Sequence, residues 1–221
     1  MQISGSVALV TGANRGLGRH FVQQLRERGA KKVYATARRG GTVDGLTLDI
    51  TDPAQVAAAA VEADDVTLLV NNAGISTGTN LVTGDLAQIR RELDTHFYGT
   101  LAMVRAFAPV LARNGGGAIL NVLSAMSWFS YDGANAYAAA KAAEWSLTNG
   151  VRIELAAQGT LVTGLHLGAA DTDMMAGYEG EKSDPAEIVR IALDGLEAGR
   201  VEVVADAWSA HIKAALAKDP A

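Results

Sequence analysis

Residues 7–18 read VALVTGANRGLG. The run from Val7 to Val10 is entirely apolar, which is typical of a strand buried on both faces of a parallel sheet. Glycines follow at positions 12, 16 and 18, and a helical pattern begins at Gly16. Glycines let a backbone approach a pyrophosphate closely, and a helix N-terminus offers that group free N–H donors. We interpret the segment as a phosphate-binding loop; an ordinary strand-to-helix turn is the alternative.

Further apolar runs alternate with helical stretches along the rest of the chain. The apolar runs predict strands near residues 6–11, 32–36, 45–48, 66–71, 117–123, 161–166 and 201–204. The stretches between them predict helices near residues 16–29, 53–62, 85–113, 134–157, 185–198 and 206–217. This alternation predicts an α/β fold, a doubly wound (Rossmann) parallel sheet of about seven strands flanked by helices, in a single domain over 1–221. Residues 168–184 have little periodicity and are expected to form a lid, a binding loop or a disordered segment.

The composition narrows the class of protein. Hydrophobic residues make up 49% of the 221 residues and charged residues 19%, which is typical of a globular chain. The formal net charge of −5 argues against nucleic acid or an anionic membrane as the main partner. Cysteine is absent, which excludes disulfides and thiolate metal sites, and we assign no metal site. The start does not resemble a signal peptide and no run of 18 apolar residues occurs, so we expect a cytoplasmic protein.

The charges near the second strand bear on the choice of dinucleotide. NAD sites often hold an acidic residue about 20 residues past the glycines, where it binds the ribose 2′-hydroxyl. This chain has Arg38 and Arg39 there, and Arg15 inside the glycine loop. Guanidinium groups match a 2′-phosphate, so NADP(H) is favoured over NAD. Solvated surface arginines are the alternative interpretation.

A second group of polar residues lies in the middle of the chain. Tyr137 and Lys141 are four residues apart, which puts a phenol and an ammonium on one face of a helix. A nearby cation lowers the pKa of a phenol, so Tyr137 could exchange a proton with a carbonyl or alcohol oxygen. Ser124 follows the apolar run ILNVL, at a strand end where open α/β sheets bind ligands. Its hydroxyl could hold a substrate oxygen in front of Tyr137, although a helix-capping serine is also possible.

Together these motifs resemble the short-chain dehydrogenase/reductase family, in its single-domain, NADP-preferring form. The resemblance extends from Val7 to about Val204. It rests on T-G-x-x-x-G-x-G at 11–18, Asp49, Asn71-Asn72-Ala73-Gly74, Ser124 and Tyr137-x-x-x-Lys141.

The resemblance implies a role for most of these residues. Asp49 would bind the adenine amino group, Lys141 the nicotinamide ribose, and Thr172 the carboxamide, while Asn71 and Gly74 would line the cofactor and steady the sheet. The implied cofactor-binding set is Gly12, Asn14, Arg15, Gly16, Leu17, Gly18, Arg38, Asp49, Ile50, Asn72, Ala73, Gly74, Tyr137, Lys141 and Thr172. The implied catalytic set is Ser124, Tyr137, Lys141 and His96.

Two positions depart from the family pattern. His96 stands where many members have an asparagine that helps to hold a water on the proton path to the lysine. Histidine also forms hydrogen bonds but is bulkier and titrates near neutral pH, so we expect either an altered proton relay or a structural role for His96. Leu167-Gly168 stands where many members have Pro-Gly, and we expect a looser turn there.

The expected reaction is hydride transfer between NADP(H) and a carbonyl or alcohol carbon. An NADP(H) sensor without turnover and a dehydratase or epimerase on the same fold are the alternatives. An apolar or aromatic substrate is expected, with walls formed by Ala125, Met126, Trp128, Phe129, Tyr131, Met174, Met175 and Tyr178. Apolar residues on more than one face of helices 85–113 and 134–157 suggest a homo-oligomer, a dimer or tetramer (Phe97, Leu101, Val104, Phe107, Trp145 and Leu147).

Overall fold

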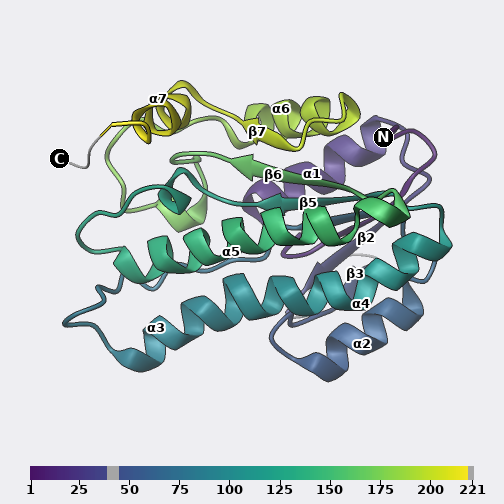
Figure 1. Cartoon of the computed structure of the whole chain (residues 1–221), viewed down its shortest axis with the longest axis horizontal. Helices are drawn as coiled ribbons and strands as arrows, with labels where there is room; N and C mark the ends of the chain where they lie inside the picture. Colours follow the sequence, from purple (N-terminus) through teal and green to yellow (C-terminus); the bar gives the residue numbers. More distant parts are fainter. Residues whose placement is uncertain (39–44, 219–221) are drawn as a thin grey trace.

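A seven-stranded sheet, parallel throughout, forms the centre of the molecule (Figure 1). The computed structural model describes residues 1–38 and 45–218. The strands lie in the order β3-β2-β1-β4-β5-β6-β7. Strands β2 and β3 therefore extend the sheet to one side of β1, and β4 to β7 extend it to the other side. Its strands are β1 (Val7–Val10), β2 (Lys32–Ala37), β3 (Gly45–Thr47), β4 (Leu68–Asn71), β5 (Ala118–Val122), β6 (Leu161–His166) and β7 (Glu202–Val204). The predicted doubly wound single domain is confirmed, with every predicted strand present.

Helices cover both faces of the sheet (Figure 1). Helices α1 and α6 pack on one face, and α2, α4 and α5 pack on the other. The helices are α1 (Gly16–Glu27), α2 (Pro53–Glu62), α3 (Leu86–Leu93), α4 (Thr100–Arg113), α5 (Asn135–Glu154), α6 (Pro185–Glu197) and α7 (Ala207–Ala215). Within the two described ranges, no helix combines the length and the apolar character that crossing a membrane requires.

Each face of the sheet has its own apolar core. Phe21 and Leu25 of α1 pack against one face, and Phe107 of α4 packs against the other. All residues of β1, β4 and β5 are buried, as their unbroken apolar sequences predicted. The sheet is therefore fixed from both sides, and only its edges are available for binding.

Aspartates define where four of the helices begin. Asp52, Asp85, Asp184 and Asp206 each accept a hydrogen bond from a backbone N–H of the first turn. Helix α1 differs, because Arg15 precedes it and no described side chain caps its first turn. The N–H groups at the start of α1 are thus left for another acceptor.

The predicted helix over 85–113 is interrupted. Between α3 and α4 the chain forms a π-helical segment, Asp94–Gly99, which contains His96. The hydroxyl of Thr95, in this segment, donates to the carbonyl of Arg91 in α3 at 2.9 Å. A π turn is often found at a functional site, because the extra residue changes the direction of the side chains that follow.

The segment 168–184 forms a loop closed at its base, not a disordered stretch. Ala170 and Ser183 make an isolated bridge, and the Ser183 N–H donates to the Ala169 carbonyl at 2.8 Å. A short 3₁₀ turn, Asp173–Met175, lies within the loop. This closed base directs Thr172 and the two methionines toward the edge of the sheet where the strands end.

Candidate active site

A cleft of about 1110 Å³ lies at the edge of the sheet where the strands end. Each strand contributes a lining residue within two positions of its end, and these are Gly12, Arg38, Leu48, Asn72, Leu123, Leu167 and Asp206. The ends of parallel strands in an open α/β sheet are the usual place for a ligand. Apart from Gly18, the predicted site residues line this cleft, namely Gly12, Asn14, Arg15, Gly16, Leu17, Arg38, Asp49, Ile50, Asn72, Ala73, Gly74, His96, Ser124, Tyr137, Lys141 and Thr172.

The glycine loop is packed too tightly for side chains. Gly12 has a φ of +65°, and a Cβ there would lie 2.9 Å from the Cα of Ala73. The Asn72 amide donates to the carbonyls of Thr11 and Gly12, at 2.9 and 3.2 Å, which ties the loop to the end of β4. Gly18 lies below the cleft, where a Cβ would come within 2.2 Å of the Gly12 carbonyl oxygen. The cofactor contact expected of Gly18 stays a prediction; what the structure shows is that this glycine lets α1 pack against the loop.

Two arginines lie at the end of the cleft nearest the glycine loop. Arg15 is exposed and forms an ion pair with Asp173 at 3.3 Å, across the mouth of the cleft. Arg38 is exposed and also lines the cleft. Arg39, which was part of the same prediction, lies outside the described residues. Asp49 accepts hydrogen bonds from the N–H and hydroxyl of Thr51, at 3.0 and 2.7 Å.

Asn71 has a different position from its neighbours in the Asn-Asn-Ala-Gly segment. Its side chain is buried inside the sheet, not in the cleft, and donates to the Asn121 amide oxygen at 2.8 Å. Asn121 in turn donates to the Thr148 hydroxyl at 2.9 Å. This chain of hydrogen bonds joins β4, β5 and α5, so Asn71 steadies the sheet as predicted but does not line the cleft.

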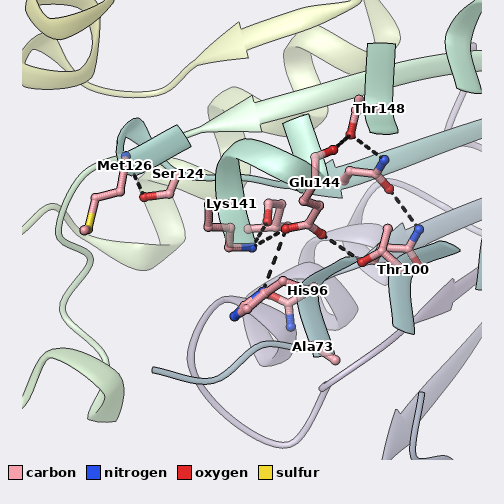
Figure 2. Close-up of polar contacts among 12 residues, drawn as sticks. Ala73, His96, Thr100, Ser124, Met126, Lys141, Glu144 and Thr148 are labelled. Carbon is pink, nitrogen blue, oxygen red and sulfur yellow. Dashed lines mark hydrogen bonds and ion pairs between the residues drawn. The ribbon is translucent and has the colours of Figure 1, made fainter. Parts of the chain in front are cut away.

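Ser124, Tyr137 and Lys141 lie around the middle of the cleft. Ser124 follows β5, and its Oγ accepts the Met126 N–H at 3.1 Å (Figure 2). Tyr137 and Lys141 are on α5, with the Lys141 Nζ 5.8 Å from the centre of the Tyr137 ring. Nζ donates to the Val122 carbonyl and to Glu144 Oε2, each at 2.7 Å. These bonds fix the ammonium beside the phenol.

The pKa of Tyr137 departs from the prediction. Burial raises the pKa of this phenol, Lys141 and the Ser124 hydroxyl lower it, and the carboxylates of Glu144 and Glu92 raise it again. The net pKa lies above the ordinary value for tyrosine, so the expected net lowering toward neutral pH is wrong. Lys141 acts in the predicted direction but is outweighed. Burial alone would lower the pKa of Lys141, but Glu144 reverses this and the net pKa is raised.

His96 lies next to Tyr137 and is buried. Its ring meets the Tyr137 ring edge to face, with centres 5.3 Å apart. Nε2 lies 2.9 Å from the Ile75 carbonyl oxygen, 3.4 Å from the Ile75 amide nitrogen and 3.3 Å from Glu92 Oε2. Nδ1 is 3.8 Å from Glu144 Oε2 (Figure 2). His96 therefore contacts both buried carboxylates from the π-helical segment.

Aromatic and methionine side chains form the other end of the cleft. Six of the predicted wall residues line it, namely Met126, Phe129, Tyr131, Met174, Met175 and Tyr178. Ala125 and Trp128 do not. Ala125 is buried, and Trp128 stacks on His166 with ring centres 3.9 Å apart, beneath the wall. Trp208 of α7 completes the wall and meets Phe129 edge to face at 5.1 Å.

The turn at Leu167-Gly168 is held firmly, in contrast to the looser turn expected there. The Ala125 N–H donates to the Leu167 carbonyl at 2.8 Å. The Gly168 N–H donates to Asp206 Oδ2 at 2.7 Å. Asp206 also caps α7, so one carboxylate ties this turn to the helix that carries Trp208.

Comparison with known proteins agrees with this geometry. A family model described as short chain dehydrogenase matches residues 6–183. The chain belongs to the short-chain dehydrogenase family. A crystal structure of a short chain dehydrogenase from Burkholderia cenocepacia in complex with NADP is 42% identical to it, with a TM-score of 0.94, and the match covers 99% of this chain and 96% of that one.

A curated relative of this short-chain dehydrogenase is the 3-oxoacyl-(acyl-carrier-protein) reductase FabG of Vibrio harveyi. The two are 31% identical over 188 residues, which is 79% of this chain and 77% of that protein. A second solved structure, of a short-chain dehydrogenase/reductase from Burkholderia xenovorans, is 27% identical, with a TM-score of 0.82 over 95% of this chain and 98% of that one. The fold and the family are therefore established over nearly the whole chain.

Sequence reasoning missed three side chains of the short-chain dehydrogenase site. Glu144 lies three residues after Lys141, and Glu92 four residues before His96, so helical spacing alone would have placed each pair on one face. Trp208 carried no such signal, because its approach to Phe129 depends on the docking of α7.

Proposed function

We propose that this short-chain dehydrogenase interconverts a ketone or aldehyde and the corresponding alcohol, with NADP(H) as hydride carrier. The observation that carries the proposal is the position of Ser124, Tyr137 and Lys141 between two unlike ends of one cleft. One end has a glycine loop and two arginines, and the other has an aromatic wall. Such a cleft can hold a dinucleotide and a small apolar molecule end to end.

The residues at the glycine end fit a dinucleotide. Gly12 and Gly16 leave a backbone surface that a Cβ would fill, and the first turn of α1 has no described side-chain cap. Arg15 and Arg38 would hold a 2′-phosphate, and Asp49 and Ile50 would hold the adenine. The NADP complex of the 42% identical Burkholderia cenocepacia protein supports this choice.

The protein's own residues manage the proton in this reaction. The bound cofactor supplies or accepts the hydride at the carbonyl carbon. In the reductive direction Ser124 donates a hydrogen bond to the substrate oxygen, and Tyr137 transfers its phenolic proton to that oxygen. Tyr137 is left as a phenolate, which Lys141 stabilises until a proton from solvent replaces the one transferred. Thr172 would orient the nicotinamide end of the cofactor.

The substrate end favours a free apolar or aromatic carbonyl compound. Aromatic rings and methionines bind such molecules through their apolar area. Among the described lining residues the basic ones are Arg15, Arg38 and Lys141, all at the cofactor end or the centre, whereas Glu181 and Asp206 line the cleft as acids. The name of the Vibrio harveyi relative supports ketone reduction.

Substitution of Tyr137 by phenylalanine tests the reaction. With a panel of aromatic and aliphatic ketones and aldehydes, the wild type should consume NADPH, and Tyr137→Phe should lose at least about 100-fold in kcat because the proton donor is gone. The readout is NADPH absorbance, with calorimetry to verify that both proteins still bind the cofactor. Undiminished turnover in the variant would rule out the assigned role. Tight binding without turnover by the wild type would instead indicate a sensor, or a dehydratase or epimerase.

Substitution of Arg38 by aspartate tests the choice of cofactor. The substitution removes a guanidinium that would bind a 2′-phosphate. The carboxylate that replaces it should repel that phosphate and accept a hydrogen bond from the ribose 2′-hydroxyl of NADH. We expect the ratio of kcat/KM for NADPH to that for NADH to fall by at least about 10-fold. Arg26→Asp on α1, away from the cleft, is the control. An unchanged ratio in Arg38→Asp would show that the arginine is a surface charge.

A further inference from the structure

Two buried carboxylates lie beside the proposed proton donor, and the reaction above does not use them. Glu92 has no exposed surface and Glu144 is 2% exposed. Buried carboxylates are costly unless they are paired and hydrogen-bonded. The contacts that each carboxylate makes therefore indicate what it does.

Glu144 is bound at both oxygens (Figure 2). Oε2 accepts from Lys141 Nζ at 2.7 Å and lies 3.8 Å from His96 Nδ1. Oε1 accepts the Thr100 hydroxyl at 2.8 Å. The carboxylate is thus fixed directly against the ammonium that faces Tyr137.

Glu92 approaches from the other side, on α3. Its Oε1 accepts the Thr77 N–H at 2.6 Å, and its Oε2 lies 3.3 Å from His96 Nε2. Burial by itself raises the pKa of Glu92, but the bonds from His96 and Thr77 outweigh it, and the net pKa is lowered. Glu92 therefore stays ionised, with His96 between it and Glu144.

The polar side chains that face Tyr137 come from several elements of the fold. Lys141 and Glu144 lie on α5, Glu92 on α3, His96 on the π-helical segment, and the Ser124 hydroxyl follows β5. Two carboxylates and the Lys141 ammonium thus lie around the phenol, with the His96 ring between the carboxylates. An ion pair at 2.7 Å presents partly cancelling charges to a third group, so the phenol receives only a fraction of the stabilisation that Lys141 alone would give its anion.

We propose that Glu144, supported by Glu92, is a positioning residue that offsets the charge of Lys141, so that Tyr137 keeps its proton at neutral pH. At neutral pH Tyr137 then acts as a proton donor for carbonyl reduction. Alcohol oxidation needs the phenolate, so it becomes fast only in alkaline solution. This inference rests on the role of Tyr137 given under the proposed function.

Replacement of Glu144 by glutamine provides the main test. Glutamine keeps an oxygen for Lys141 and an amide for Thr100, but it removes the charge. The pH at which kcat for alcohol oxidation reaches half its maximum should fall by roughly half a unit to one unit. Glu92→Gln should move it in the same direction by a smaller amount. Glu154→Gln, an exposed position at the end of the same helix, is the matched control and should leave the midpoint unchanged.

A second measurement does not depend on turnover. The ultraviolet absorbance of tyrosinate, followed against pH, should show one tyrosine that ionises at lower pH in Glu144→Gln than in the wild type. That change should be missing when Tyr137→Phe is added. If Glu144→Gln does not fold, Glu92→Gln provides the same two measurements.

The outcomes separate this inference from the proposed function. A folded Glu144→Gln whose oxidation midpoint and tyrosinate titration match those of the wild type would overturn the inference, even if its kcat had fallen. A Tyr137→Phe protein that retains turnover overturns the proposed function instead. A shifted tyrosinate titration in a protein that lacks turnover would retain the electrostatic inference and reject the reaction.

Discussion

At the scale of single residues, His166 shows how burial determines a protonation state. It lies in β6 with no exposed surface, donates from Nδ1 to the Ser124 carbonyl at 3.0 Å, and stacks on Trp128. Burial lowers the pKa of His166 to about 4. The neutral ring thus supports the backbone of Ser124 from behind the cleft.

This low pKa predicts a sensitivity to acid. The unfolded chain takes up a proton near the ordinary pKa of 6.5, and the folded chain near about 4. The stabilisation from His166 is therefore complete above pH ~6.5 and declines as the pH falls toward ~4, by up to about 1.4 kcal/mol per pH unit. In His166→Asn, which keeps a donor but does not titrate, urea unfolding should show a shallower decline over this range.

The matched control for this prediction is His211→Asn. His211 is exposed on α7, so its removal should leave the pH dependence of the wild type unchanged. Equal slopes in His166→Asn and in the wild type would mean that His166 is protonated in the folded protein as well.

The candidate site was predictable where side-chain type and spacing carry the chemistry. Ser124, Tyr137 and Lys141 come together because a strand end and one helix face fix them. The net charge at Tyr137 was not predictable, because it depends on Glu92 and Glu144 being buried against it. A charged residue on a helix is normally solvated, and only the packing of α3 against α5 removes these two from water.

At the scale of elements, apolar periodicity predicted which elements exist but not their irregularities. The buried strands β1, β4 and β5 are continuous apolar runs, and a parallel sheet covered on both faces requires such runs. The π-helical segment inside the predicted helix 85–113 had no comparable signal. Residues 94–99 are compatible with an ordinary helix, and the close packing at the end of the segment, where a Cβ on Gly99 would meet Ile50 at 2.8 Å, is visible only in the folded structure.

At the scale of the whole molecule, the cleft is shared between distant parts of the chain. Its lining extends from Gly12 to Trp208. The homo-oligomer remains a prediction, and Val104, Phe107 and Leu147, which suggested it, are buried in the core of a single chain. Sedimentation at working concentration would measure the assembly state directly.

Trp208 gives a test of this shared architecture. It is 49% exposed and stands against Phe129 at the substrate end. Trp208→Ala should raise KM for aromatic ketones by roughly 3- to 10-fold, because about 1 kcal/mol of ring contact is lost. Small aliphatic ketones should be affected less. Leu216→Ala, at the exposed end of α7, is the control, and an equal loss for both substrate classes would indicate a general disturbance of the helix.

The central position of β1 has a consequence for how the protein is made. During synthesis β1 emerges before both of its neighbours, and Ala8 pairs with Val33 of β2, 25 residues later, but with Leu68 of β4 only after 60. From β4 onward each new strand joins the growing edge beside its predecessor. A nascent chain can therefore assemble the phosphate-binding half early, whereas the substrate wall is complete only when α7 leaves the ribosome.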